Sequence, residues 1–363
     1  MLKKRTFGMA ASVCTAMLLL SGCGLFQSDN ASEEIDPPEH NITYEDNAEE
    51  MEQAKSEETA ENGGEASEEQ AEIVKTEIYL IDKNGYVVPQ TLPLPKNEGI
   101  AKKALEYLVT GGPITELLPN GFRAVIPQDT TVSVDIKDGT AIADFSNEFK
   151  NYQPEDEQKI LQSITWTLTQ FPTVDKVKIR MNGHDLKEMP VGGTPITEDL
   201  SREDGINLDT ASVTDYTATR PLTVYYIGQS DDATYYVPVT ERVSTSETND
   251  IKAAVEKLAE GPDAGNKGLL SEFSGDLELA SDPTLTDGDL TLDFNEEIYG
   301  SADEEKKVIS SHVLNSIVLT MTEQPDIKSV SLMVNGKADL ETEEGNKLSK
   351  PVTRPVQVNT TGF

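Results

Sequence analysis

The sequence has only two cysteines, Cys14 and Cys23, in 363 residues. So few cysteines exclude a disulfide framework and a cysteine-based zinc site, even in a compartment that would permit disulfides. Aromatic residues make up 6% of the chain, and its N-terminal apolar stretch, Thr6 to Leu20, is shorter than the roughly 20 residues of a membrane-spanning helix. Stability must therefore come from burial of apolar side chains.

Positive charge is scarce as well. The chain has 30 Lys and Arg residues against 65 Asp and Glu residues, which leaves a formal net charge of −35. A nucleic-acid-binding protein needs a net basic face to displace counterions, and attraction to anionic lipid has the same requirement. The composition therefore disfavours nucleic acid as a partner and disfavours membrane binding through charge.

The first residues have the three parts of an export signal: a basic region (Lys3, Lys4, Arg5), an apolar stretch and a cleavage box. Leu20-Ser21-Gly22-Cys23 resembles the lipobox of bacterial lipoproteins, in which the Cys thiol accepts a diacylglycerol. We expect residues 1–22 to be a signal peptide, and Cys23 to carry lipid, palmitate included, on the extracytoplasmic face of the cell membrane. An incidental cysteine at a plain cleavage site, or an uncleaved signal anchor, is the alternative.

Residues 23–75 are predicted to be the lipidated cysteine followed by a disordered acidic tether. Between Ser28 and Lys75 there are 17 Asp or Glu residues against two Lys. Such a segment cannot bury enough apolar surface to offset its chain entropy. It would average about 40 Å end to end as a flexible coil. An acidic motif read by a basic partner is the alternative interpretation.

The rest of the chain contains one unit twice. Four blocks match at an offset between 146 and 153 residues: 77–82 with 223–228, 104–113 with 254–262, 138–149 with 287–298, and 160–183 with 313–336. Such a steady offset indicates tandem duplication. We predict a first domain at 76–200, a link at 201–217, a second domain at 218–355 and a tail at 356–363, and we expect each half to close its own core.

Each copy is predicted to fold in the order strand, strand, helix, strand, strand, helix, strand. Asp138-Gly139 and Asp287-Gly288 each separate two alternating runs, which is the strongest short-range hairpin signal. Apolar residues at four-residue spacing predict helices near 100–109 and 156–170. The expected fold class is α+β, with two tandem modules that each have a small sheet covered by two helices.

One constellation in the repeat could carry chemistry, namely Asp144, Phe145 and Glu148, which recur as Asp293, Phe294 and Glu297. Paired carboxylates can act as acid and base or bind a divalent cation. A structural corner, in which Phe fills the core while Asp turns outward or caps the chain, is the favoured interpretation. Duplicated structural corners are more common than duplicated catalytic sites. No catalytic residue is therefore assigned.

Other polar residues point to no cofactor and no metal. The three histidines lack metal-ligand spacing, and Asp287-Gly288-Asp289 lacks the pattern of a calcium loop. The pairs Tyr225-Tyr226 and Tyr235-Tyr236 differ, because adjacent residues of a strand face opposite sides. We expect one Tyr of each pair to be exposed, as an ordinary surface residue or as a contact for a protein partner.

Together, the lipobox, the acidic tether and the doubled module resemble the family of sporulation and germination lipoproteins built from GerMN domains. The likeness covers roughly residues 76–355, and residues 266–275 are where the second copy departs most. The resemblance implies a module similar to the ring-building folds of envelope secretion systems. It also implies a noncatalytic role in the assembly that bridges mother cell and forespore.

The leading hypothesis is a noncatalytic, lipid-tethered scaffold in the space between the mother-cell and forespore membranes. Its expected partners are the membrane, through Cys23, and other sporulation envelope or ring-forming proteins, with homo-oligomerisation left open. A peptidoglycan-acting enzyme that uses the paired carboxylates is the first alternative. A solute-binding lipoprotein with a deep cleft between the modules is the second.

Overall fold

The computed structural model describes residues 73–96, 99–197, 199–210, 215–230, 233–299 and 307–360. All of them belong to one compact unit of the chain. Cys23, the other lipobox residues Leu20, Ser21 and Gly22, and nearly all of the predicted tether lie outside the described residues. Within the ranges described, every helix is too short or too polar to cross a membrane.

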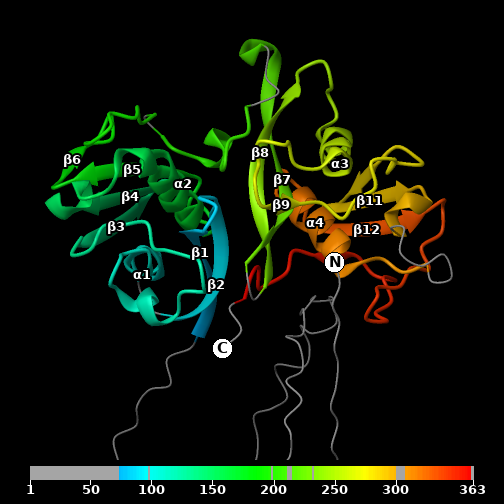
Figure 1. The fold of residues 1–363 in the computed structure, drawn as a ribbon, viewed down its shortest axis with the longest axis horizontal. Coiled ribbons are helices and arrows are strands. Elements are labelled where there is room, and N and C mark those ends of the chain that lie inside the picture. The colour runs from blue at the N-terminus through cyan, green and yellow to red at the C-terminus, as the bar shows by residue number, and fades with distance from the viewer. Residues whose placement is uncertain are drawn as a thin grey trace, which may run out of the picture. The chain divides into compact units, whose positions relative to one another are not determined.

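The first half, residues 73–210, contains a long hairpin, two α-helices and a four-stranded sheet (Figure 1). Its elements are β1 (Ile73–Ile81), β2 (Val87–Pro95), α1 (Ile100–Tyr107), β3 (Val132–Lys137), β4 (Thr140–Phe145), α2 (Glu157–Leu168), β5 (Lys176–Met181) and β6 (His184–Asp185). Short 3-10 helices are η3 (Pro113–Glu116), η4 (Asn147–Lys150), η5 (Pro154–Asp156) and η6 (Arg202–Asp204).

The second half, residues 215–360, repeats this order, with one additional two-residue strand after its first helix. Its elements are η7 (Tyr216–Ala218), β7 (Thr219–Gln229), β8 (Thr234–Ser244), α3 (Asp250–Glu260), β9 (Leu269–Leu270), β10 (Thr284–Thr286), β11 (Asp289–Phe294), η8 (Glu296–Tyr299), α4 (Ser311–Thr322), β12 (Ser329–Val334) and β13 (Val352–Thr353). The predicted α+β class and the order of elements in each copy are confirmed.

The Asp-Gly turns form as predicted. Asp138 and Gly139 have φ angles of 50° and 77°, and Asp287 and Gly288 have φ angles of 54° and 96°. Two successive left-handed residues make the type I′ turn that matches the twist of a hairpin. In β4 and β11 the residues alternate between buried and half-buried, so one face of each strand lines the core.

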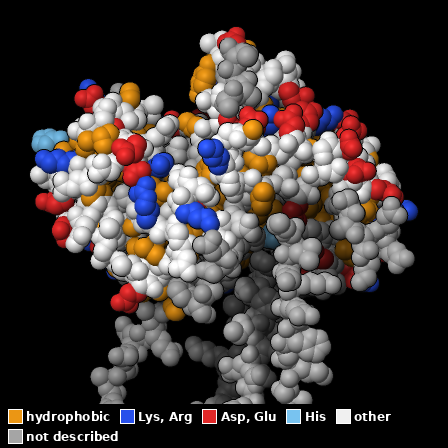
Figure 2. Space-filling model, viewed as in Figure 1, with side chains coloured by type: hydrophobic (Ala, Val, Ile, Leu, Met, Phe, Trp, Pro, Cys, Tyr) orange, Lys and Arg blue, Asp and Glu red, His pale blue; other side chains and the backbone are white. Residues whose placement is uncertain are grey.

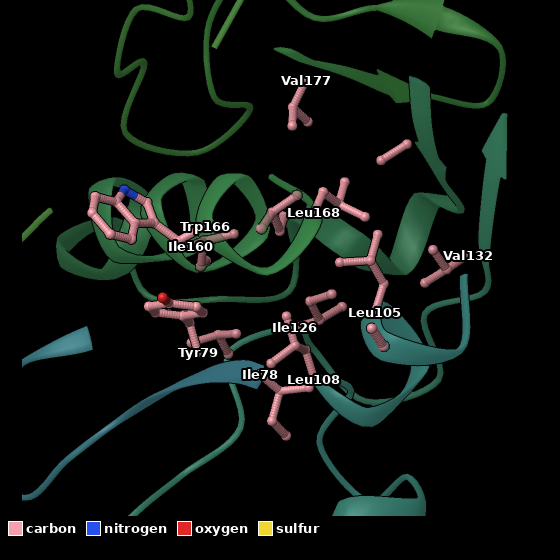
Figure 3. Packing of buried hydrophobic residues seen from close by; sticks show 14 of the residues in the cluster. Ile78, Tyr79, Leu105, Leu108, Ile126, Val132, Ile160, Trp166, Leu168 and Val177 are labelled. Carbon is pink, nitrogen blue, oxygen red and sulfur yellow. The ribbon is translucent and has the colours of Figure 1, made fainter. Parts of the chain in front are cut away.

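The layering differs from the predicted single sheet. Each half has two sheets, ordered β1-β2 and β3-β4-β5-β6 in the first half and β8-β7-β9 and β10-β11-β12-β13 in the second. The helices lie between the hairpin and the larger sheet, as Figure 3 shows for α2 between Tyr79 of β1 and Val177 of β5. Ten of the twelve residues of α2 are buried, and so are ten of the twelve residues of α4. A helix that is buried nearly all round needs cover on more than one side, and the hairpin supplies it.

Each half closes its own core. One cluster of buried apolar side chains contains residues from Ile78 to Ile206 only. The other contains residues from Leu222 to Val352 together with Val88, which crosses from the first half. Within the first core, Leu105 of α1 and Leu108, which follows the last residue of α1, lie near Ile126 and the β1 residue Ile78 (Figure 3). The cores are separate, and the partly buried Tyr86 and Phe122 of the first half also pack against the second core.

The predicted exposure of the tyrosine pairs is wrong. Tyr225, Tyr226, Tyr235 and Tyr236 are 0%, 1%, 5% and 8% exposed. Tyr225 and Tyr236 pack with Leu319 of α4 and with Val358, while Tyr226 and Tyr235 belong to the second core with residues of α3. Both faces of the β7–β8 hairpin are therefore covered by segments that lie far away in the sequence.

Candidate functional site

The two repeated aspartates bind backbone amides. The Oδ1 atom of Asp144 accepts the N–H of Gly183 at 3.0 Å, and the carboxylate of Asp293 accepts the N–H of Gly336 at 2.9 and 3.1 Å. Each of these glycines is the second residue of an Asn-Gly turn in the left-handed conformation. In both copies the carboxylate therefore ties the end of the central strand to the turn that follows the neighbouring strand.

The other members of the repeated signature are divided between core and surface. Phe145 is 1% exposed and stacks on Phe149 with ring centroids 4.3 Å apart, and Phe294 is fully buried. Glu148 is partly exposed, and a hydrogen bond with Ser146 lowers the pKa of its carboxyl group. Glu297 is exposed. The aspartates and glutamates of the signature thus have different surroundings.

Of the three histidines, His40 lies outside the described residues, and the other two lie in different halves of the fold. His184 is exposed on β6, and the Nδ1 atom of His312 lies 3.1 Å from the hydroxyl of Tyr236. Within the described part of the chain, no group of three or more His, Cys, Asp or Glu side chains is placed to hold a metal ion.

The most elaborate polar geometry lies where the two halves meet. Strand β2 of the first half approaches β8 of the second, although the two belong to different sheets (Figure 1). Pro89 on β2 and Pro238 on β8 hold matching positions, because they pair with the matching residues Tyr79 and Tyr225. Proline has no N–H to donate, so it interrupts direct pairing between these two strands.

Two asparagine side chains fill this interruption. Asn207 accepts the N–H of Val87 at 2.8 Å and donates to the carbonyls of Val87 and Pro238 at 2.8 and 2.7 Å. Asn359 accepts the N–H of Tyr236 at 2.7 Å and donates to the carbonyls of Tyr236 and Pro89 at 2.8 and 2.9 Å. Each asparagine, which we call a clamp, therefore binds one strand of its own half and one strand of the other.

The residue before each clamp pairs with the opposite half. The N–H of Ile206 donates to Thr240 Oγ1 at 2.9 Å, and the N–H of Thr240 donates to the Ile206 carbonyl at 2.8 Å. In the same way, the N–H of Val358 donates to Thr91 Oγ1 at 2.9 Å, and that hydroxyl donates to the Val358 carbonyl at 2.8 Å. The two halves thus exchange their final segments reciprocally, as partners in a two-fold dimer would.

An ion network crosses the same junction. Arg202 of the first half pairs with Glu323 of the second, and Arg354 of the second half lies 3.5 Å from Glu323 and 3.7 Å from Glu77 of the first. Burial disfavours the charge on Glu323, but the two guanidinium groups outweigh this and lower the pKa of its carboxyl group. Arg202 also stacks over Trp166, 4.3 Å from the ring centroid.

A cleft of about 450 Å³ opens beside this network. Its walls include Glu77, Gln170, Arg202, Glu323 and Arg354. A solute-binding protein would need a cleft at this place, between the halves. Here four charged side chains of the walls pair with one another, namely Glu77, Arg202, Glu323 and Arg354.

A second hollow of about 680 Å³ lies beside α3 in the second half. Its charged lining is mainly acidic, with Glu256, Glu260, Glu278 and Asp282 against Lys252. On the face shown in Figure 2, acidic side chains gather over the part of the second half near α3. This surface repels anionic ligands.

The junction residues were missed by the repeat blocks, which end at 183 and 336. The residues of the junction form a six-residue motif that begins with arginine and ends with an aliphatic residue followed by asparagine. It occurs twice, at Arg202 to Asn207 and at Arg354 to Asn359. Its offset of 152 residues lies within the range of the other blocks. This repeat is present in the sequence, but its first copy falls in the predicted link, and its second copy spans the boundary between the predicted second domain and the predicted tail.

Comparison with known proteins agrees with this architecture. The model of the Germane family, described as sporulation and spore germination, matches residues 77–187 and 223–340. The spore germination protein GerM of Bacillus subtilis (strain 168) is 62% identical over 367 residues, and the match covers 100% of both chains. The solved tandem GerMN domains of the sporulation protein GerM from Bacillus subtilis are 65% identical, with a TM-score of 0.75 over 80% of this chain and 100% of that one. The resemblance predicted from the sequence is confirmed, and the chain belongs to the Germane family of sporulation and spore germination proteins.

Proposed function

We propose that this protein is a noncatalytic scaffold of the sporulating cell envelope, held to a membrane by lipid on Cys23. The observation that carries the proposal is the reciprocal junction, in which Ile206 pairs with Thr240 and Val358 pairs with Thr91. Two modules that exchange their ends and share clamps form one body with fixed outer surfaces. Such a body suits the presentation of binding surfaces better than a cycle of opening and closing.

The placement of the repeated carboxylates supports a structural role for them. Asp144 and Asp293 each accept a backbone amide of an Asn-Gly turn, which is a use for the carboxylate in both copies. A general acid or base must instead reach a substrate proton. We therefore assign Asp144, Phe145, Glu148 and their counterparts Asp293, Phe294 and Glu297 to the fold rather than to chemistry.

The proposed location follows from the N-terminal sequence. A diacylglycerol on Cys23 would fix one end at the extracytoplasmic face, in the space between mother-cell and forespore membranes. The acidic residues between Ser28 and Lys75 would repel one another and extend the connection. The proposed partners are other proteins of the sporulation envelope, bound through the outer surfaces of the two halves.

The proposal is tested in a Bacillus subtilis strain that lacks its own GerM protein and carries this chain instead. We expect a Glu148→Gln, Glu297→Gln double variant to support spore germination as well as the unaltered chain. An Asn207→Ala, Asn359→Ala double variant should fail, while Asn151→Ala, at an exposed asparagine outside the junction, should not.

A biochemical experiment tests the enzyme alternative. The purified chain is incubated with cell wall, and soluble muropeptides are measured. The scaffold proposal would be overturned if muropeptides are released and Asp144→Asn abolishes this release. Asparagine keeps an oxygen that can accept the Gly183 N–H, so this variant removes only the acid–base function of the side chain.

A further inference from the structure

The four-stranded sheet of the first half ends in an open edge at β3. The strand order places β3 at the outside of the sheet, with β4 as its paired neighbour. Near the hairpin turn Asp135, Ile136 and Lys137 are all exposed, and Ile136 is 41% exposed. An open edge that presents an exposed isoleucine is a template for another strand.

The backbone of Ile136 faces this open edge. Lys137 and Thr140 flank the two-residue turn and form the hydrogen-bonded pair that closes the hairpin. Because hydrogen-bonded and non-hydrogen-bonded pairs alternate along an antiparallel ladder, the next pair, Ile136 and Ala141, is of the second kind. The N–H and C=O of Ile136 therefore point away from β4, where a new strand could bind them.

The side chains beside Ile136 make this edge complementary to itself. Asp135 and Lys137 share one face of the strand, because they are two residues apart. In an antiparallel pair of two β3 strands centred on Ile136, each Asp135 lies opposite the Lys137 of the other copy. We propose that two copies of this chain associate through their β3 edges in this register, with two-fold symmetry. A second copy of this chain is therefore one of the partners of the proposed scaffold.

The second half shows what the charges add. Its matching edge strand β10 has Leu285 in the place of Ile136, at 45% exposure, between Thr284 and Thr286. That edge has the apolar residue but no charged residue on either side of it. Charges on an edge strand normally prevent pairing with other strands. Asp135 and Lys137 are two residues apart, so in the two-fold register alone each faces a residue of opposite charge in the other copy. The partner of β3 is therefore another β3.

The interface is small, so the dimer is weak in solution. In this register only residues 135–137 of each copy lie opposite each other, and such short segments bury far less than the ~800 Å² per partner of a standard interface. On a membrane, lipid on Cys23 would confine both copies to one surface and raise their effective concentration. This one step depends on the proposed function, whereas the pairing itself does not.

The test measures self-association of the full chain by sedimentation in excess mild detergent, at concentrations up to roughly 1 mM. We expect a reversible dimer for the unaltered chain. Asp135→Lys and Lys137→Asp alone should each weaken it about tenfold or more, since each places like charges opposite each other twice. The double variant Asp135→Lys, Lys137→Asp should restore it. A monomer throughout, or a double variant no better than the single ones, would overturn the proposal.

Disulfide crosslinking in membranes provides a second measurement. A hydrogen-bonded antiparallel pair has Cα atoms about 5.5 Å apart, within reach of a disulfide. Mild oxidation should link two copies of an Ile136→Cys variant and leave the matched Leu285→Cys variant unlinked. Equal linking of both variants would contradict the assigned edge. Membrane fractionation of the same samples reports on the lipid anchor separately, so failure of the scaffold proposal and failure of the pairing can be told apart.

Discussion

Glu157 is a buried carboxylate whose hydrogen bonds all join separate segments of the first half. Its side chain accepts the N–H groups of Val191 at 3.1 Å and Thr194 at 3.0 Å and the hydroxyl of Tyr152 at 2.9 Å, and it also accepts the N–H of Gly192. Burial alone would raise its pKa, but these donors outweigh it and lower the pKa to about 2. The charge at the start of α2 thus holds the loop that follows β6.

We predict that Glu157→Gln lowers the free energy of unfolding by about 2–3 kcal/mol at pH 7, because the new amide group faces backbone donors in place of an acceptor. A carboxyl group whose pKa is lowered on folding stabilises the protein fully above its unfolded value, near 4.5, and loses this contribution as the pH falls towards 2. The difference between the two proteins should therefore shrink between pH 4.5 and pH 2.

Chemical denaturation across this pH range provides the measurement. Glu155→Gln, at an exposed position two residues earlier, is the matched control and should change stability little at any pH. A Glu157→Gln protein that is as stable as the unaltered one at pH 7 would show that the loop contacts contribute little.

At the residue scale, the sequence predicted what local chemistry decides. The left-handed Asp138-Gly139 turn follows from the residues themselves. The tyrosine pairs were predicted wrongly because their exposure depends on Leu319 and Val358, which meet the hairpin only in the folded protein. The role of Glu157 could not be predicted either, since the backbone N–H groups that it accepts lie more than thirty residues away along the chain.

At the scale of elements, the clamps and the exchanged segments are the feature with the largest mechanical consequence. We predict that Asn359→Ala lowers the free energy of unfolding by about 2–4 kcal/mol, since it removes three hydrogen bonds and leaves the Tyr236 N–H without its acceptor. Asn207→Ala should cost a similar amount, because Asn207 makes the matching three bonds.

Thermal denaturation of the two variants provides the comparison, with Asn151→Ala as the control. Similar losses for the two clamps are the signature of a symmetric junction. A large loss for Asn207→Ala with no loss for Asn359→Ala would mean that the C-terminal segment contributes nothing to the folded state.

The order of elements was predictable because helix periodicity and strand alternation are properties of short windows. The second sheet of each half was not predictable, because a short stretch of sequence does not show whether a hairpin joins a neighbouring sheet or covers a helix. The sequence of α4 does indicate a second cover, because its Val, Leu, Ile and Met residues extend beyond one stripe of the helix. A helix of this kind is buried on nearly every side, as α4 is.

At the scale of the whole molecule, the N-terminal sequence and the folded part make separable contributions. The junction and both cores involve residues from Glu77 onward. We therefore predict that Cys23→Ala releases the protein from the membrane fraction without changing its thermal unfolding. Membrane fractionation with circular dichroism on the same preparation tests this, and a variant that stays with the membranes would contradict lipid anchoring.

The junction predicts that the covalent link between the halves is dispensable once the protein has folded. Thr210 and Asp215 are exposed at the ends of the connection, so a protease site inserted between them should be accessible. After cleavage, the exchanged residues Ile206 and Val358 and the buried Val88 still bind the opposite half. We expect the two fragments to co-elute as one species of unchanged size in size-exclusion chromatography.

The clamp variants give this prediction its control. Each clamp makes one hydrogen bond to the opposite half, worth about 1 kcal/mol, so loss of both clamps should weaken association of the cleaved fragments about thirtyfold. The Kd of the two fragments should therefore be about thirtyfold higher for Asn207→Ala with Asn359→Ala than for the unaltered protein, whereas cleaved Asn151→Ala protein should match the unaltered one. Separation of the unaltered fragments would mean that the linker, and not the reciprocal exchange, holds the two modules in one body.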